Sequence, residues 1–202
     1  MDKSMIKNTV ILTCITLIAG LALGITYEVT KEPIAKANEE AKQEAYLEVF
    51  SSASYFEEMD IDLEEVNNII EVTYSSKTMD EIMLAYDQDD FVGYVFTITS
   101  HDGYGGDITY SVGITKEGVV NAISILSISE TAGLGMNATE DAFKDQFNEK
   151  VVDSFEVVKT TVSEDNQIQA ISGATVTSEA VTSGVNACLL CFEDILGGFN
   201  NE

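Results

Sequence analysis

The chain has 202 residues, enough for one domain of ordinary size with accessory segments and for a core that folds without disulfides. Its 35 acidic residues outnumber ten basic residues, all of them lysine, and the formal net charge is −25. This balance excludes a nucleic-acid-binding surface, which requires a basic footprint, and three cysteines are too few for a disulfide framework.

Residues 8–27 form an uncharged apolar run bracketed by Lys7 and Glu28. About twenty apolar residues are what a helix needs to cross a bilayer, so we expect one transmembrane helix; a cleaved signal peptide is the alternative. Lys3 and Lys7 precede the run and place residues 1–7 in the cytoplasm by the positive-inside rule. The rest of the chain is then expected outside the cytoplasmic membrane.

Residues 28–68 have the composition of a helical stalk followed by an acidic connector. Pro33 suits the first turn of a helix over residues 31–50. An apolar stripe supports this helix and consists of Ile34, Ala37, Ala41, Ala45 and Val49. Residues 51–68 are acidic and irregular, which predicts a loop or a short helix.

From residue 69 onward, the sequence is dense in Val, Ile, Thr, Tyr and Phe, which favour strands. A hairpin turn is expected at 116–118. The expected strands are 69–74, 90–100, 107–115, 119–129, 154–162 and 166–171. Residues 69–202 are therefore predicted to form an α+β domain with a largely antiparallel sheet flanked by helices, attached to the N-terminal transmembrane helix.

One helix of this domain is expected to begin at Thr139, with Glu140 and Asp141 in its first turn and Phe143 and Phe147 on one face.

A second helix is expected from about Ser178 to Leu196, where Gly197 and Gly198 end it. Its apolar stripe consists of Val181, Val185, Cys188, Phe192 and Ile195.

The stretch QAISGATVTSEAV, residues 169–181, places a turn rich in hydroxyl groups between a strand and a helix that begins near Thr177 or Ser178. The free amides and the dipole of a first helical turn favour phosphate, and Gly173 and Ala174 let a large group approach the backbone. By itself, the Ser-Gly-Ala-Thr turn is better explained by ordinary helix capping than by a phosphate site.

Three motifs in order resemble the FMN-binding domain family of bacterial membrane redox complexes. SGATVTS, 172–178, resembles the family motif in which FMN is joined by a phosphodiester to the threonine after Gly-Ala, here Thr175. The Gly-Tyr-Gly-Gly segment within 102–114 and the loop ETAGLG, 130–135, resemble two further family motifs. With its single anchor, the chain is most similar to the G subunit of the Rnf ion-translocating ferredoxin:NAD oxidoreductase, and next to the C subunit of the sodium-pumping quinone reductase.

The resemblance implies FMN linked covalently to Thr175, and no catalytic or metal-binding residue. The loop 130–135 is expected to hold the flavin ring, although its glycines also suit a plain strand-to-helix loop. The other residues expected at the cofactor are Ser172, Gly173, Ala174, Thr177, Ser178, Tyr104, Glu130, Thr131, Gly133, Leu134 and Gly135.

The resemblance also implies an electron-carrier subunit in a complex that couples electron transfer between ferredoxin and NAD to sodium or proton transport. Its expected partners are the other membrane and peripheral subunits, including a second membrane subunit with covalent FMN, and a flavin transferase for maturation. The alternatives are a subunit of the related quinone reductase, a flavin-free structural or assembly subunit, and an extracytoplasmic reductase for a small acceptor.

Two positions depart from the family pattern: Gln169 stands where an aspartate is usual, and Ala132 replaces a proline. Neither change removes a group that bonds to FMN. The acidity provides a physical reason for a covalent link, because an acidic chain without arginine binds a phosphate dianion poorly. An ester leaves a single negative charge and prevents dissociation. The same acidity otherwise serves solubility or attracts a basic partner.

Other reactive residue types are assigned ordinary roles. His101 is expected in an exposed loop, and the pair Cys188 and Cys191 is expected in the core of an apolar helix. Cys14 is expected to face lipid or a neighbouring helix. The acidic stretch 57–65 lacks the spacing of an EF-hand loop and is expected to face solvent.

Overall fold

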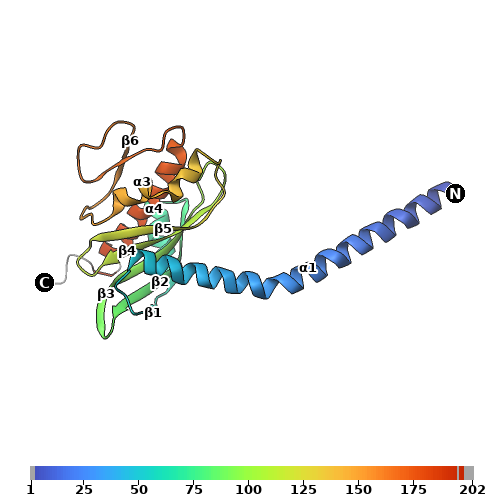
Figure 1. Ribbon diagram of the computed structural model, residues 1–202, viewed down its shortest axis with the longest axis horizontal. Coiled ribbons are helices and arrows are strands. Elements are labelled where there is room, and N and C mark those ends of the chain that lie inside the picture. The colour runs from blue at the N-terminus through green and yellow to red at the C-terminus, as the bar shows by residue number, and fades with distance from the viewer. Residues whose placement is uncertain (1–2, 195, 198–202) are drawn as a thin grey trace. The chain divides into compact units, whose positions relative to one another are not determined.

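The computed structural model describes residues 3–194 and 196–197, and the chain divides into two units, residues 1–42 and 43–202 (Figure 1). Helix α1, Lys3–Val49, makes up the described part of the first unit and contributes its last turns to the second. It contains an exposed window of mean hydropathy 2.2 and is long and apolar enough to cross a membrane. Pro33 lies inside this continuous helix, so the expected helix start at Pro33 is wrong.

The second unit is built on a five-stranded antiparallel sheet whose strands are hydrogen-bonded in chain order. The strands are β1 (Tyr55–Glu58), β2 (Lys77–Asp87), β3 (Asp90–Ser100), β4 (Ile108–Thr115) and β5 (Val120–Ile128). The expected strands at 90–100, 107–115 and 119–129 are confirmed, and the turn at 116–118 joins β4 to β5. The α+β class with a largely antiparallel sheet is therefore confirmed.

The strand expected at 69–74 is wrong, because these residues end helix α2, Leu63–Thr73. Val66 and Ile70 are its buried residues, and this spacing of four is helical. Asp62 begins the helix by accepting a hydrogen bond from the Glu64 amide. β1 and β2 were not predicted. In β2, the register shifts between Met79 and Glu81, and this bulge interrupts the alternation that marks a strand in sequence.

Residues 135–147 form three short helical turns where the sequence predicted one helix capped by Thr139. They are the 3-10 helix η1 (Gly135–Thr139), the single turn α3 (Asp141–Lys144) and the 3-10 helix η2 (Asp145–Phe147). Thr139 ends η1 and donates its hydroxyl to the Met136 carbonyl, so it caps nothing downstream. Phe143 and Phe147 do pack together, edge to face, with ring centroids 5.6 Å apart.

β6 (Glu156–Val158) and β7 (Gln167–Gln169) lie within the stretches expected as strands but are shorter, and they pair in parallel outside the main sheet. Helix α4, Thr175–Asp194, follows β7 and packs across β3 and β4 (Figure 1).

The expected apolar stripe of α4 is buried at Val181, Val185, Cys188 and Phe192, whereas Ile195 and Gly198 lie outside the described residues. Cys191 is buried as well, and burial raises its pKa to about 12. Burial also raises the pKa of Cys188 well above its usual value. These two thiols are therefore core residues, as expected, and are poorly suited to redox chemistry.

Candidate functional site

The elbow between β7 and α4 is fixed by hydrogen bonds on both sides of the turn. The Ala174 amide donates to the Ile171 carbonyl at 2.9 Å, and Gly173 adopts a φ of 77°, which favours glycine. The fully buried Ser178 hydroxyl accepts a hydrogen bond from the Ile171 amide at 2.9 Å and donates to the Ala174 carbonyl at 3.0 Å. These contacts start α4 at Thr175, earlier than the position near Thr177 or Ser178 that the sequence indicated.

The two glycine-rich loops lie against each other because their glycines lack side chains. A Cβ at Gly105 would collide with the carbonyl of Ser129, and one at Gly103 would lie 3.1 Å from Glu130 Oε1. A Cβ at Gly135 would lie 2.7 Å from both Glu130 Cβ and Thr177 Oγ1. Three segments that are far apart in the sequence therefore meet at the first turn of α4.

A cavity of about 530 Å³ opens where these segments meet, within the roughly 300–1,000 Å³ usual for small-molecule sites. Gly133 and the buried Ser178, both expected at a cofactor, are not among the residues that line it, nor is Ser172. Val176 was not predicted, although it lies within the quoted motif. The residues that line the cavity are Tyr104, Glu130, Thr131, Leu134, Gly135, Gly173, Ala174, Thr175, Val176 and Thr177.

The cavity has an apolar rim and an acidic wall. Tyr104, Leu134 and Val176 are large side chains that remain exposed, Tyr104 to 78%. Glu130, in contrast, is 9% exposed, and its Oε1 has no hydrogen-bond partner among the described residues. Buried polar atoms in native proteins are nearly always paired, so an orphaned carboxylate oxygen in the wall of a cavity indicates a place for a donor group.

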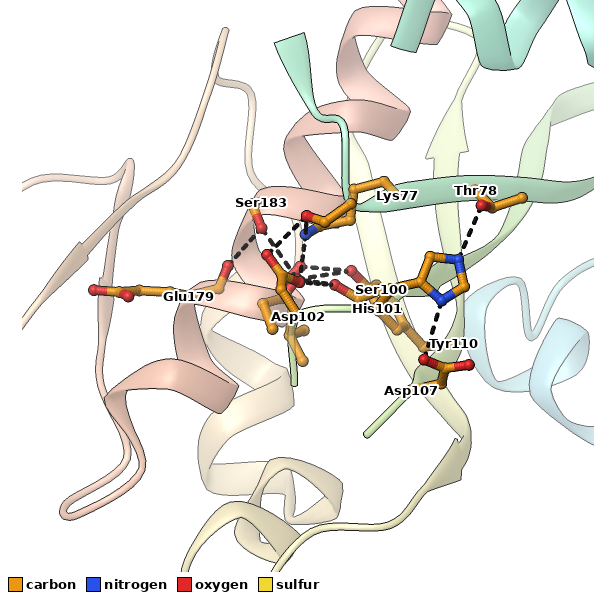
Figure 2. Close-up of polar contacts among 12 residues, drawn as sticks. Lys77, Thr78, Ser100, His101, Asp102, Asp107, Tyr110, Glu179 and Ser183 are labelled. Atoms are coloured by element: carbon orange, nitrogen blue, oxygen red, sulfur yellow. Dashed lines mark hydrogen bonds and ion pairs between the residues drawn. The ribbon is translucent and has the colours of Figure 1, made fainter. Parts of the chain in front are cut away.

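An ion pair with a buried lysine holds Asp102, the residue just before the Gly-Tyr-Gly-Gly segment, in place. Lys77, at the start of β2, has a side chain only 1% exposed, and its Nζ lies 2.6 Å from Asp102 Oδ1 (Figure 2). The Ser76 and Ser100 hydroxyls each donate to Asp102 at 2.9 Å. Burial alone would raise the pKa of Asp102, but these hydrogen bonds and the charge of Lys77 outweigh it and lower the pKa.

The same cluster reaches α4. Ser100 Oγ lies 2.7 Å from the Ala180 carbonyl, and the buried Tyr110 hydroxyl donates to the Val181 carbonyl at 2.7 Å (Figure 2). The helix that begins at the elbow and the loop that follows Asp102 are thus attached to one polar cluster. His101 lies on the exposed side, as expected, between Thr78 and Asp107.

The fold and the site have counterparts in known proteins. Residues 103–190 match the model of the FMN-binding domain, and residues 1–49 match the RnfG N-terminal region. Over 196 residues the chain is 34% identical to the G subunit of the Na⁺-translocating ferredoxin:NAD⁺ oxidoreductase complex of Acetobacterium woodii, covering 96% of this chain and 94% of that one. The chain belongs to the G-subunit family of ion-translocating oxidoreductase complexes.

Other members of the G-subunit family agree over shorter or more divergent alignments. The G subunit of the proton-translocating ferredoxin:NAD⁺ oxidoreductase complex of Clostridium ljungdahlii is 44% identical over 107 residues, which are 53% of this chain and 57% of that one.

The crystal structure of NqrC from Shewanella oneidensis superposes with a TM-score of 0.54 at 12% identity, over 77% of this chain and 93% of that chain. That likeness supports the fold alone.

The residues at the cavity fit FMN, the ligand for which the matched domain is named. The first turn of α4 offers free backbone amides to a phosphate. Gly173 and Gly135 leave room that a side chain would fill, and Glu130 offers an unpaired acceptor to the N–H and O–H groups of a flavin nucleotide. The apolar rim suits an aromatic ring.

Asp102→Asn should destabilise the protein, because Lys77 would keep its buried charge and lose its carboxylate partner. Asp102 is partly exposed, so we expect a loss of about 1.5–3 kcal/mol, as for hydrogen bonds to charged groups, and less than the ~3–5 kcal/mol of a fully buried pair. This loss in the free energy of unfolding is measured by urea unfolding of the full chain in detergent, monitored by near-UV circular dichroism.

The pH dependence of that loss follows from the lowered pKa of Asp102. The ionised carboxylate stabilises the native state above its usual pKa of 3.8, and this contribution disappears as the pH falls through the lowered value. The difference between wild type and variant should therefore begin to shrink below about pH 3.8 and vanish below the lowered pKa of Asp102. Asp107→Asn, at the exposed pair with His101, is the control; an equal effect there would contradict the importance of burial.

Ser178→Ala should lower the free energy of unfolding by about 1–3 kcal/mol, because it leaves the Ile171 amide without its acceptor. Ser183→Ala is a matched control, since Ser183 also bonds to the carbonyl four residues earlier but holds no backbone amide outside the helix. The same urea unfolding compares them. Equal losses would show that the contact across the elbow contributes nothing.

Proposed function

We propose that this chain is a membrane-anchored electron-carrier subunit of an ion-translocating ferredoxin:NAD oxidoreductase, with FMN attached to Thr175 as its carrier. Membership of the G-subunit family supports the complex, and the meeting of three motifs around one cavity supports the cofactor. FMN takes up and releases electrons when bound. The chain's own part is to hold the flavin, exclude water from it and set its electrostatic surroundings.

Thr175 is the hydroxyl of the elbow best suited to carry the phosphate. It is the first residue of α4, it lines the cavity, and it is only half-buried, so an enzyme can reach it. Thr177 is 1% exposed, and the Ser178 hydroxyl is engaged on both sides of the turn. Ser172 is exposed but does not line the cavity.

A covalent bond suits the charge of the site. No lysine is among the residues that line the cavity, and the chain has no arginine, so a phosphate would find neutral amides at the helix start and no cation. In the attachment, Thr175 Oγ1 loses its proton and forms a phosphodiester with FMN. A flavin dinucleotide as donor, with a nucleoside monophosphate leaving, balances the reaction. The partner required for this step is a flavin transferase.

Gln169 does not argue against a flavin. Its backbone N–H donates to Gln146 Oε1 at 2.7 Å, and its backbone carbonyl accepts from Gln146 Nε2 at 3.4 Å. These contacts do not involve the Gln169 side chain. The residue is exposed and does not line the cavity. A glutamine in place of the usual aspartate therefore does not alter the lining of the cavity. This favours an electron carrier with FMN over a flavin-free assembly subunit.

We further propose that residues 8–27 span the cytoplasmic membrane with residues 1–7 in the cytoplasm. The apolar window of α1 supports the span, and Lys3 and Lys7 support the orientation. The second unit, residues 43–202, then lies outside, joined to the span by residues 28–42. There it exchanges electrons with the membrane subunits of the complex, among them a second one with covalent FMN.

Thr175→Ala should abolish flavin attachment without unfolding the domain, because it removes only the attacking hydroxyl and one methyl group from a half-buried side chain. Wild type and variant are coexpressed with a flavin transferase and compared by intact-protein mass and by flavin fluorescence in denaturing gels. Thr182→Val, in the same helix but away from the cavity, should keep the full label. A labelled Thr175→Ala protein, or an unlabelled wild type, would refute the assignment.

The orientation can be tested by thiol labelling in intact cells. Glu117→Cys lies in the exposed turn between β4 and β5 and should react with a membrane-impermeant maleimide, whereas Ser4→Cys should react only after permeabilisation. Cys188 and Cys191 are buried and give little background. The reverse pattern would place the domain in the cytoplasm.

A further inference from the structure

We propose that the Glu130 carboxylate accepts a hydrogen bond from the bound flavin nucleotide and that its negative charge makes this flavin harder to reduce. The inference rests on the proposed function and assigns a role to one residue within it. Glu130 is thereby a binding and potential-setting residue of the site.

Glu130 differs from the other acids of the chain in its burial. It is the only acidic side chain among the buried residues that the structure describes, and it lies in the wall of the cavity. Its Oε1 has no hydrogen-bond partner and it forms no ion pair among the described residues. Burial of an unpaired carboxylate is costly, so a site that keeps one has a use for it.

The surroundings hold the carboxylate in place. A Cβ on Gly103 would lie 3.1 Å from Oε1, and a Cβ on Gly135 would lie 2.8 Å from Oε2. Two of the three motifs thus contribute a glycine directly beside the Glu130 carboxyl group. Side chains at either position would displace the group, and the glycines therefore preserve both the cavity and the position of the acid.

The chemistry of the ligand complements this acceptor. A flavin nucleotide carries an imide N–H on its ring and hydroxyls on its ribityl chain, all of them donors. Reduction adds electrons to the ring, and a fixed negative charge in the same cavity opposes that change. No lysine lines the cavity to cancel the charge of Glu130, and the dipole of α4 acts at the phosphate end.

The test is a redox titration of the flavinylated full chain in detergent. In Glu130→Gln, the flavin midpoint potential should rise by at least about 30 mV, which is a tenfold change in the equilibrium constant of a two-electron reduction. Glu140→Gln removes the same charge from an exposed position outside the cavity and should have a smaller effect because solvent screens it. Glu130→Asp keeps the charge and should stay near the wild-type potential.

The outcomes separate this inference from the proposed function. Wild type without FMN refutes the function itself. Wild type with FMN and equal potentials in Glu130→Gln and Glu140→Gln overturns the role of Glu130 and leaves the function intact. If Glu130→Gln folds by near-UV circular dichroism but carries no FMN, normal loading of Glu130→Asp supports the acceptor. Loss of loading in both variants overturns the proposal.

Discussion

The position of α4 on the sheet is the constraint on which the site depends. The Tyr110 hydroxyl reaches from β4 to the Val181 carbonyl, and Gly184 leaves the space that this hydroxyl occupies, because a Cβ there would collide with it. If α4 shifted along the sheet by one turn, it would lose this hydrogen bond and leave a void beside the Tyr110 ring. Thr175 at the helix start is therefore presented at a fixed height above the sheet.

The second part of the site is a loop, and a loop needs a separate anchor. Asp102 provides it through Lys77 and the hydroxyls of Ser76 and Ser100. Since Ser100 also reaches the Ala180 carbonyl, one cluster couples the loop and the helix. A buried ammonium group is costly to desolvate. The ion pair therefore fixes the position of the loop more than it stabilises the fold. The hydrophobic core alone would leave the loop free to move relative to Thr175.

Sequence reasoning succeeded where the signal is local and failed where it is spatial. The strands 90–100 and 107–115 are dense in β-branched and aromatic residues, and the elbow motif is contiguous, so both could be predicted. Residues 69–74 combine β-branched and apolar residues that fit a strand, but residues 69–73 belong to helix α2, which buries Val66 and Ile70 in the core.

The features of the site that were missed depend on contacts between distant residues. Lys77 and Asp102 are 25 positions apart and read as ordinary surface charges until the fold buries the lysine. The isolation of Glu130 depends on Gly103, from another segment, and on Gly135, at the far end of its own loop. A sequence motif can identify such residues, but it does not show which of their atoms lack a hydrogen-bond partner. Burial and pairing are properties of the assembled structure.

Charge connects these observations. Lys77, Lys144 and Lys150 pair with acids elsewhere, so the cavity has helix amides and one carboxylate but no cation. Such a site holds an anionic cofactor weakly by electrostatics, and a covalent ester removes the need for cations there. Once the phosphate is tethered, a lysine near the ring would raise the flavin potential, whereas Glu130 lowers it. Covalent attachment thus leaves the electrostatics of the cavity available for setting the potential, which a reversible phosphate site could not do as freely.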